Sequence, residues 1–345
     1  MKLVRTEDAV GQVLCHDITQ IIPGVVKDAV FRKGHIVTKE DIPVLLSVGK
    51  ENLYIWEKQE GMLHENEAAE ILRQICQGEH MHPSEVKEGK IELIADCEGV
   101  LKINTEKLNA VNNLGEMMIA SRHGNFPVKT GDKIAGTRII PLVIEEEKMQ
   151  KACEVAGKEP IFRILPYQKK KAGIVTTGSE VYYHRIEDKF TPVVIEKLKE
   201  GGVTEVKQIQ CNDDHEMIME AIQTLIEDGS DLIVCTGGMS VDPDDRTPLA
   251  IKNACTEVVT YGAPVLPGAM FMLAYCEKEG RQIPVMGLPG CVMYAKRTIF
   301  DLVLPRIMCD EKLHEKDFRL LGQGGLCLSC PVCTFPNCGF GKGGY

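Results

Sequence analysis

The stretch that decides the fold is KKKAGIVTTGSE (169–180), in which an apolar strand pattern runs directly into a glycine turn. The same arrangement recurs in DLIVCTGGMSVDPDD (231–245) and in RQIPVMGLPG (281–290). Between the first two lies DDHEMIMEAIQTLIEDG (213–229), whose apolar residues recur at helical spacing. Strands separated by helix-length amphipathic segments are typical of βαβ units, so the sequence predicts an α/β domain with a parallel sheet.

The glycine turns predict a binding site. TTGSE (176–180), TGGMSVDPDD (236–245) and GLPGC (287–291) each follow an apolar run directly. Parallel strands all point the same way, so we expect these turns to emerge on one edge of the sheet, where open α/β folds bind ligands. One glycine after a strand is ordinary turn chemistry. Three such turns on one edge, with free N–H groups, predict a site for a phosphorylated small molecule.

The rest of the chain predicts two further parts. Residues 1–150 are interpreted as a β-rich N-terminal module, with helices over DIPVLLSVGK (41–50) and HENEAAEILRQICQG (64–78). A proline-containing linker then leads into the α/β domain, which is expected over 168–310. Residues 311–345 form a Cys-rich C-terminal tail.

Composition narrows the classes of function. Of the 345 residues, 44% are hydrophobic and 26% are charged, which is ordinary for a globular protein with more than one domain. The formal net charge of −10 argues against nucleic acid or an acidic membrane as partner, because both require a basic patch. No apolar run approaches the roughly 18 residues of a membrane helix. The charged start lacks the apolar core of a secretory signal, so a cytoplasmic location is expected.

Residues 172–309 resemble the molybdopterin-binding domain shared by the MogA, MoaB, MoeA and gephyrin proteins. The resemblance rests on TTGSEV, LIVCTGGMSVDPDD, PVLPGAMF and GLPGCVMYA, which occur in the order and at about the spacing of that family's TGDE, GGxSxGxxD, PGKP and LPGNP elements. The opening segments EDAVGQVLCHDI and FRKGHIVTKEDIPVLLSVG are similar to the MoeA type. The resemblance therefore implies a divergent MoeA-like molybdopterin molybdenumtransferase that binds molybdopterin or its adenylylated form.

The resemblance also implies the site residues. Glu180 and Asp245 fall on acidic positions that would hold a divalent cation or position molybdate, and they are the candidate catalytic residues. Ser240 would donate its hydroxyl to a phosphate. Matched by motif, the positions that would contact the cofactor are Thr177, Gly178, Ser179, Gly237, Gly238, Ser240, Pro267, Gly268, Leu288, Pro289 and Gly290.

Several positions depart from the family's pattern. Asp242 replaces a glycine of the second motif, Ala269 stands where the family has a phosphate-binding lysine, and Cys291 replaces an asparagine. Losing the lysine weakens anion affinity unless Arg246 or Arg297 substitutes for it. The SxxDGYA element of the MoeA type is also absent from the sequence. Binding is therefore better supported than catalysis.

The acidic loop after the second motif has two interpretations. Asp242, Asp244 and Asp245 could form an ordinary solvated turn in which an aspartate caps the helix beginning near Thr247 and Pro248. They could also hold Mg²⁺, which takes one or two carboxylates together with the phosphates of a ligand. Carboxylates beside a phosphate repel it, so a cation between them is physically sensible.

The tail carries four of the fourteen cysteines, Cys327, Cys330, Cys333 and Cys338, at the spacing C-x2-C-x2-C-x4-C. Short paired spacings in a glycine-rich segment indicate a metal site with thiolate ligands, and the spacing does not separate Zn²⁺ from an iron–sulfur cluster. Disulfides or a disordered tail are the alternatives. The other ten cysteines are dispersed, mostly among apolar residues, as expected of small buried side chains in a reducing compartment.

Three functions compete at this stage. The first is a molybdenumtransferase that binds adenylylated molybdopterin and inserts the metal from molybdate. The second is a non-catalytic carrier that delivers molybdopterin or the finished cofactor to a client molybdoenzyme. The third is a nucleotide pyrophosphatase, because competence-damage-type proteins share this fold. The resemblance to MoeA further implies a homodimer.

Overall fold

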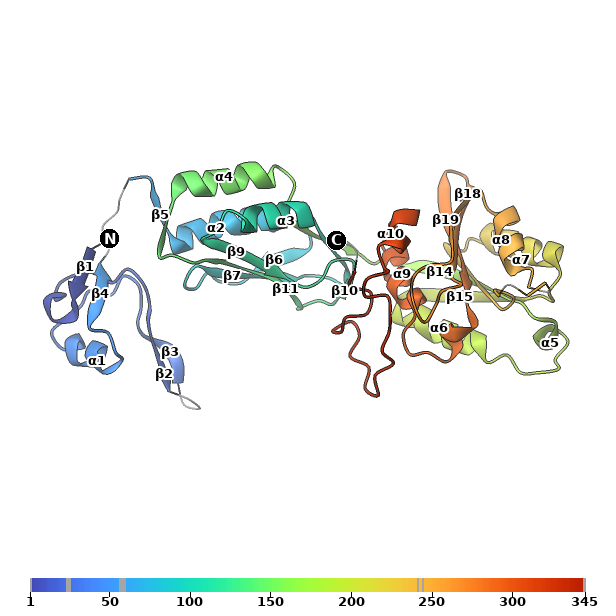
Figure 1. Ribbon diagram of the computed structural model, residues 1–345, viewed down its shortest axis with the longest axis horizontal. Helices are drawn as coiled ribbons and strands as arrows, with labels where there is room; N and C mark the ends of the chain where they lie inside the picture. Colours follow the sequence, from blue (N-terminus) through green and yellow to red (C-terminus); the bar gives the residue numbers. More distant parts are fainter. Residues whose placement is uncertain (1, 23–25, 56–59, 241, 244, 344–345) are drawn as a thin grey trace. The chain divides into compact units, whose positions relative to one another are not determined.

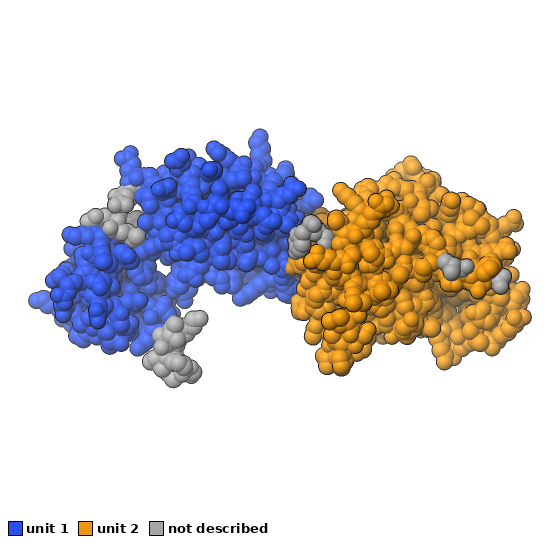
Figure 2. Space-filling model, viewed as in Figure 1, with its two compact units in different colours: residues 1–96, 103–122, 131–163 blue, residues 97–102, 123–130, 164–345 orange. Residues whose placement is uncertain are grey.

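The computed structural model describes residues 2–22, 26–55, 60–240, 242–243 and 245–343, which fall into two compact units (Figures 1 and 2). Unit 1 comprises residues 1–96, 103–122 and 131–163, and unit 2 comprises 97–102, 123–130 and 164–345. Two short segments of the region interpreted as the N-terminal module therefore group with unit 2, as does the Cys-rich tail. In unit 2 these segments contribute β8 (Gly99–Ile103) and β10 (Pro127–Val128), which pair antiparallel.

The first 55 residues of unit 1 form a small β-rich lobe. It contains two antiparallel strand pairs, β1 with β4 and β2 with β3, and a short helix, α1. The predicted helix is confirmed, but it ends at Ser47, shortly before Gly49, whose φ of 78° is unfavourable for other residues. The bounds are β1 (Lys2–Arg5), β2 (Ile18–Ile22), β3 (Val26–Phe31), α1 (Asp41–Ser47) and β4 (Asn52–Ile55).

The remainder of unit 1 contains a four-stranded antiparallel sheet in the order β6–β7–β11–β9, with α2 and α3 packed on one face and α4 packed on these two helices (Figure 1). Helix α2 packs on this sheet through Ala68, Leu72 and Cys76, which confirms the amphipathic helix predicted there. The bounds are β5 (Met62–His64), α2 (Glu65–Cys76), β6 (Met81–Pro83), β7 (Lys90–Ala95), α3 (Thr105–Asn112), β9 (Met117–Ser121), β11 (Lys133–Ile139), β12 (Val143–Glu145) and α4 (Glu146–Ala156).

A buried histidine fixes the start of α2. His64 is the N-cap residue, and its Nδ1 accepts from the backbone N of Asn66 at 3.2 Å and lies 3.0 Å from Lys33 Nζ. Its Nε2 lies 2.8 Å from the carbonyl oxygen of Cys15 and therefore carries the proton. This arrangement suits the neutral imidazole, and burial lowers the pKa of His64.

Unit 2 is built around a six-stranded sheet in the order β15–β14–β16–β19–β18–β17. The first four strands are parallel, which confirms the predicted α/β domain, whereas β18 runs antiparallel to β19. The reversal follows from a tight hairpin in which Glu279 and Gly280 both have positive φ, 52° and 76°. The six strands are β14 (Lys170–Thr176), β15 (Val203–Gln210), β16 (Leu232–Thr236), β17 (Glu257–Tyr261), β18 (Met272–Lys278) and β19 (Arg281–Leu288). Strand β13 (Phe162–Pro166) lies outside this sheet and pairs with β8.

Helices cover both faces of this sheet. Neighbouring strand residues point to opposite faces, so Leu232 and Val234 pack with α6 and α9, whereas Ile233 and Cys235 pack with α7 and α8. A central strand that is buried on both faces reads as a continuous apolar run. The helices are α5 (Ser179–Tyr182), α6 (Phe190–Glu200), α7 (His215–Glu227), α8 (Thr247–Ala254), the 3-10 helix η2 (Gly290–Met293), α9 (Ile299–Met308) and α10 (Glu315–Arg319). No described helix is both long and apolar enough to cross a membrane.

Helix α9 begins at a buried carboxylate. Asp301 is 5% exposed, accepts from the backbone N of Thr298 at 2.7 Å, and pairs with Lys197 Nζ at 2.8 Å and Arg297 at 2.9 Å. It therefore caps α9 and ties it to α6.

Asp301→Ala should destabilise the protein by about 3–5 kcal/mol, because it leaves the ammonium of Lys197 buried without its partner. Urea unfolding measures this. The matched control is Glu200→Ala, which removes the exposed partner of Arg297 and should cost less than about 1 kcal/mol. Equal losses in the two variants would contradict the role given to Asp301.

Stability should fall as the pH drops below about 6.5. Burial places the folded-state pKa of His16 and His64 below the ordinary value of 6.5, so between the two values the unfolded chain binds more protons. His64→Asn keeps an N-cap side chain and should flatten the decline between pH 7 and pH 5.5 in urea titrations. Burial raises the pKa of Glu65 and gives the opposite slope, but this contribution is common to both proteins. Identical slopes would show that His64 does not contribute.

Candidate functional site

The glycine turns lie on one edge of the unit 2 sheet, as predicted. In the register of the parallel strands Thr176 pairs with Thr236, and Thr236 pairs with Leu288, so β14, β16 and β19 end at the same level. Strand β15 ends there too, because the backbone N of Cys211 donates to the carbonyl of Thr176. The reversal of β18 brings the turn between β17 and β18, residues 262–271, to the same edge.

The first and second turns pack tightly against each other. The backbone N of Thr177 donates to the carbonyl of Thr236 at 2.8 Å, and its hydroxyl lies 3.1 Å from the hydroxyl of Thr247. Gly237 and Gly238 have φ of 88° and 55°. A Cβ on Gly237 would lie 2.4 Å from the carbonyl oxygen of Thr177, and one on Gly238 would lie 2.7 Å from the Thr247 hydroxyl. Glycine is therefore required at both positions.

Backbone N–H groups in these turns are held by carboxylates. The N–H of Ser179 donates to Asp213 at 2.8 Å, and the N–H of Ser240 donates to Asp245 at 2.8 Å. The Ser240 hydroxyl accepts from the N–H of Asp242 at 3.2 Å, which leaves its own proton to donate. Asp245 is thus part of the turn itself. The predicted helix cap is wrong, because the N-cap residue of α8 is Arg246 and, among the described residues, no side-chain hydrogen bond caps this helix.

Two polar groups border the second turn. The Thr236 hydroxyl is buried and has no hydrogen-bond partner among the described residues, so a ligand or water beside it would satisfy it. The Tyr261 hydroxyl donates to the carbonyl of Met239 at 3.3 Å. Burial and the nearby carboxylate of Asp245 raise the pKa of Tyr261, which keeps the phenol protonated.

The turn between β17 and β18, which carries Pro267 and Gly268 and is the third turn of this edge, packs against the start of α9; the turn after β19, GLPGC (287–291), is the fourth. A Cβ on Gly268, whose φ is 128°, would lie 2.5 Å from the side chain of Ile299, and the carbonyl of Pro267 accepts from the N of Ile299 at 3.2 Å. Leu288, the last residue of β19, is fully buried in the core and anchors the start of the turn GLPGC (287–291). A Cβ on Gly290 would meet no atom within 4 Å, so the surroundings of this residue are open.

The charged side chains predicted for the site differ in their exposure and in the partners that they contact. Arg297 pairs with Glu200 and Asp301 and lies 5.3 Å from the ring of Phe335, so it is committed elsewhere. Arg246 is exposed at the N-cap of α8, beside the second turn. Glu180 is exposed and faces Gly178.

The predicted metal sites are not preassembled. Across the described ranges no group of three or more His, Cys, Asp or Glu side chains is arranged to hold a metal ion. Asp242 is exposed, and Asp244 lies outside the described residues. Mg²⁺ at the turns would therefore need the phosphates of a ligand as additional donors.

The Cys-rich tail is folded against the third turn. The N of Leu266 donates to the carbonyl of Gly325, and the N of Cys327 donates to the carbonyl of Leu266, both at 2.8 Å. Phe340 is buried in the core of the domain. Cys330 and Cys333 are exposed thiols, and all four tail cysteines line a pocket of about 540 Å³ that also includes Pro267 and Tyr294.

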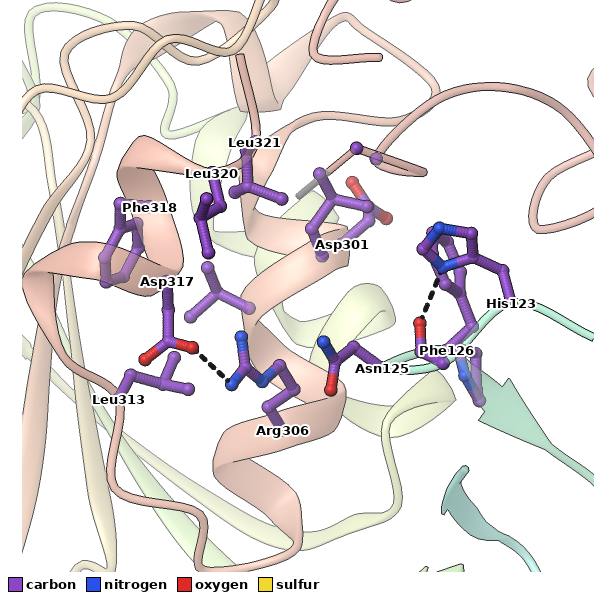
Figure 3. A pocket seen from close by; sticks show the side chains of 16 residues that line it. His123, Asn125, Phe126, Asp301, Arg306, Leu313, Asp317, Phe318, Leu320 and Leu321 are labelled. Carbon is purple, nitrogen blue, oxygen red and sulfur yellow. Dashed lines mark hydrogen bonds and ion pairs between the residues drawn. The ribbon is translucent and has the colours of Figure 1, made fainter. Parts of the chain in front are cut away.

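A different cavity, of about 60 Å³, lies beside α9 (Figure 3). Arg306 lines this cavity, and its guanidinium points at Asp317 and pairs with it at 2.9 Å. Arg306 also pairs with Glu311. Because this guanidinium is paired within the protein, the cavity is interpreted as a feature of the core.

Comparison with known families identifies the α/β domain. Residues 173–308 match a family model described as "Probable molybdopterin binding domain". The α/β domain belongs to this family. Residues 3–57 match a second model, described as a domain of unknown function (DUF8806). The predicted likeness of the opening segments to the MoeA type stays a prediction.

The chain also has individual relatives among known proteins. A CinA-like protein of Mycobacterium tuberculosis is 35% identical over 85 residues, which are 25% of this chain and 20% of that protein. One of Mycobacterium avium is 34% identical over 95 residues, 28% of this chain and 22% of that protein. The chain thus covers about a fifth of the length of these relatives.

Among solved structures, the chain is similar to the tungsten cofactor synthesizing protein MoaB of Pyrococcus furiosus, which is 19% identical, with a TM-score of 0.32, over 41% of this chain and 89% of that one. The protein CinA of Thermoplasma acidophilum is 16% identical, with a TM-score of 0.33, over 40% and 98%.

Two polar residues at the edge of the molybdopterin-binding domain, Asp213 and Tyr261, were not predicted from the sequence. Asp213 follows the end of β15, which carries no glycine and so gave no turn signal. Tyr261 ends β17, a strand whose direction depends on the reversal of β18. An acidic run directly after a parallel strand, such as Asp213 with Asp214, was the available signal.

Gly237→Ala should lower the free energy of unfolding by about 1–3 kcal/mol or more, because a methyl group there meets the backbone of Thr177 at positive φ. Gly290→Ala is the matched control and should change stability by no more than about 0.5 kcal/mol. Urea unfolding of both variants checks the claim. A tolerated alanine at Gly237 would mean that the two turns are not packed as described.

Proposed function

We propose that the α/β domain binds adenylylated molybdopterin at the carboxyl edge of its sheet and, with Mg²⁺, inserts molybdenum supplied as molybdate. Family membership supports a molybdopterin ligand. The observation that carries the finer proposal is the acidity of the first two turns, where the N–H groups of Ser179 and Ser240 are held by Asp213 and Asp245.

Those carboxylates decide how a phosphate can bind. Free N–H groups at a glycine turn would attract a phosphate directly. Here Asp213 and Asp245 occupy them, and Glu180 and Asp242 add exposed negative charge. A phosphate at this edge needs a cation in between, and Mg²⁺ bridges one or two carboxylates to phosphate oxygens. A divalent cation held beside a pyrophosphate is also what cleavage of adenylylated molybdopterin to AMP requires.

Arg246 is the proposed replacement for the lysine that Ala269 displaces. It is exposed next to Asp245 at the start of α8, whose N-terminal N–H groups also favour an anion. The Ser240 hydroxyl, whose proton is free to donate, would add one hydrogen bond to phosphate.

A nucleotide pyrophosphatase is the second candidate. The similarity to CinA-like proteins favours it, and the same acidic turns would suit cleavage of a nucleotide pyrophosphate. A non-catalytic carrier of molybdopterin remains the outcome in which the ligand binds and no AMP is released.

The remaining expectations stay predictions. A Zn²⁺ or iron–sulfur site in the tail would require Cys327, Cys330, Cys333 and Cys338 to move together, because they do not converge on a metal position. The homodimer, the client molybdoenzyme and the cytoplasmic location rest on resemblance and composition alone.

Asp245→Asn should separate binding from metal insertion. The amide oxygen of asparagine can still accept from the N–H of Ser240 and preserve the turn, but the cation loses a charged ligand. We expect molybdopterin binding within about threefold of the wild type and AMP release, with molybdate and Mg²⁺ added, reduced by about 100-fold or more. Titration with adenylylated molybdopterin measures the first, and chromatographic detection of AMP measures the second.

Asp245→Ala is the matched control for the structural role, since it removes both the charge and the hydrogen bond and should weaken binding as well. If Asp245→Asn binds as poorly as Asp245→Ala, the carboxylate is a binding group and not a catalytic one. If the wild type cleaves a nucleoside diphosphate compound and ignores the pterin, the pyrophosphatase replaces the proposal.

A further inference from the structure

Two cysteine sulfurs in unit 2 lie unusually close together. The Sγ atoms of Cys255 and Cys276 are 2.7 Å apart, and both residues are free thiols. Ordinary contact between carbon atoms is about 3.5–4.0 Å, and sulfur is the larger atom. Forming a disulfide from this position needs a further approach to about 2.05 Å.

Backbone contacts keep the pair together. Cys255 follows the end of α8, and Cys276 lies within β18. Between them Thr256 donates to the carbonyl of Tyr275 through both its N and its hydroxyl, at 2.9 Å each. The Cys276 sulfur also contacts the carbonyl of Ala254 at 3.4 Å. The two sulfurs are thus held from both chain segments.

Access to the pair is restricted to small molecules. Cys276 is 5% exposed, and Cys255 is half-buried at the edge of the core between the sheet and α8. A hydrogen peroxide molecule is small enough for such a position, whereas a peptide disulfide such as oxidised glutathione is hindered.

We propose that Cys255 and Cys276 form a redox-active pair that a peroxide converts into a disulfide within the molybdopterin-binding domain. The inference is independent of the proposed function, because it rests on the sulfur geometry alone.

The reaction balances with peroxide as the oxidant. Either thiol can donate in the contact between the two sulfurs, and donation from the S–H of Cys255 lowers the pKa of Cys276, which favours its thiolate. This thiolate attacks one peroxide oxygen, the O–O bond breaks, and the departing hydroxide takes a proton and leaves as water. The sulfur of Cys255 then attacks the sulfenic acid on Cys276, and its proton leaves with the hydroxyl as a second water. Two thiols lose two electrons, and one peroxide becomes two waters.

The bond would join the end of α8 to β18. The other end of α8 carries Thr247, whose hydroxyl contacts Thr177 and would meet any Cβ on Gly238. Oxidation would therefore fix the helix that supports the second glycine turn.

The test treats the full chain with a small excess of hydrogen peroxide, blocks remaining thiols with iodoacetamide, and digests it without reduction. The protease should cleave after glutamate, because Glu257 lies between the two cysteines and no Lys or Arg does. Mass spectrometry should find the Cys255 and Cys276 peptides joined, at a mass lower by two hydrogens than their sum. The joined species should disappear after treatment with dithiothreitol. The oxidised protein should also melt several degrees higher than the reduced one, because the cross-link closes a loop in the unfolded chain.

Cys276→Ala should abolish both the cross-link and the rise in melting temperature, whereas Cys211→Ala, which removes another buried thiol of the same core, should leave both intact. The wild-type measurement does not depend on either variant folding. Recovery of Cys255 and Cys276 as alkylated thiols while the exposed Cys330 and Cys333 are oxidised would overturn the proposal.

Discussion

The α/β domain depends on the close approach of two turns that only glycine permits. The backbone of Gly237 passes so near the carbonyl of Thr177 that a single methyl group would collide with it. This approach lets Thr177 bond to the end of β16 and to the first residue of α8 at the same time. Helix α8, the second turn and the ends of the central strands are therefore positioned together, and the carboxylates of Asp213 and Asp245 take their places around them.

Periodicity and the order of turns were enough to predict the general architecture. Buried strands such as β16 have continuous apolar runs, and α7 has apolar residues at helical spacing, so both follow from local sequence. The common edge of the turns follows from the parallel direction of the strands. These features could be predicted because each depends on a short stretch of residues and one rule of packing.

Other features depend on residues far apart in the sequence and could not be predicted in this way. Asp213, which follows β15, accepts from the N–H of Ser179, which follows the neighbouring strand β14. Cys327 bonds to Leu266 although about sixty residues separate them. Segments 97–102 and 123–130 pack with unit 2 through tertiary contacts that no local pattern encodes. The closeness of Cys255 and Cys276 likewise arises only after β17 and β18 have paired.

The hairpin at Glu279 and Gly280 also affects how freely each edge of the sheet can change in sequence and length. By reversing β18, it leaves this tight connection at the amino edge of the sheet, on the side opposite the glycine turns. The carboxyl edge therefore carries closely packed glycine turns in which substitutions cause steric clashes, whereas the amino edge has a short solvent-facing loop at this hairpin. Lineages descended from this chain could lengthen the hairpin and acquire new attachments there without altering the ligand edge, so the two ends of the sheet are open to change at very different rates.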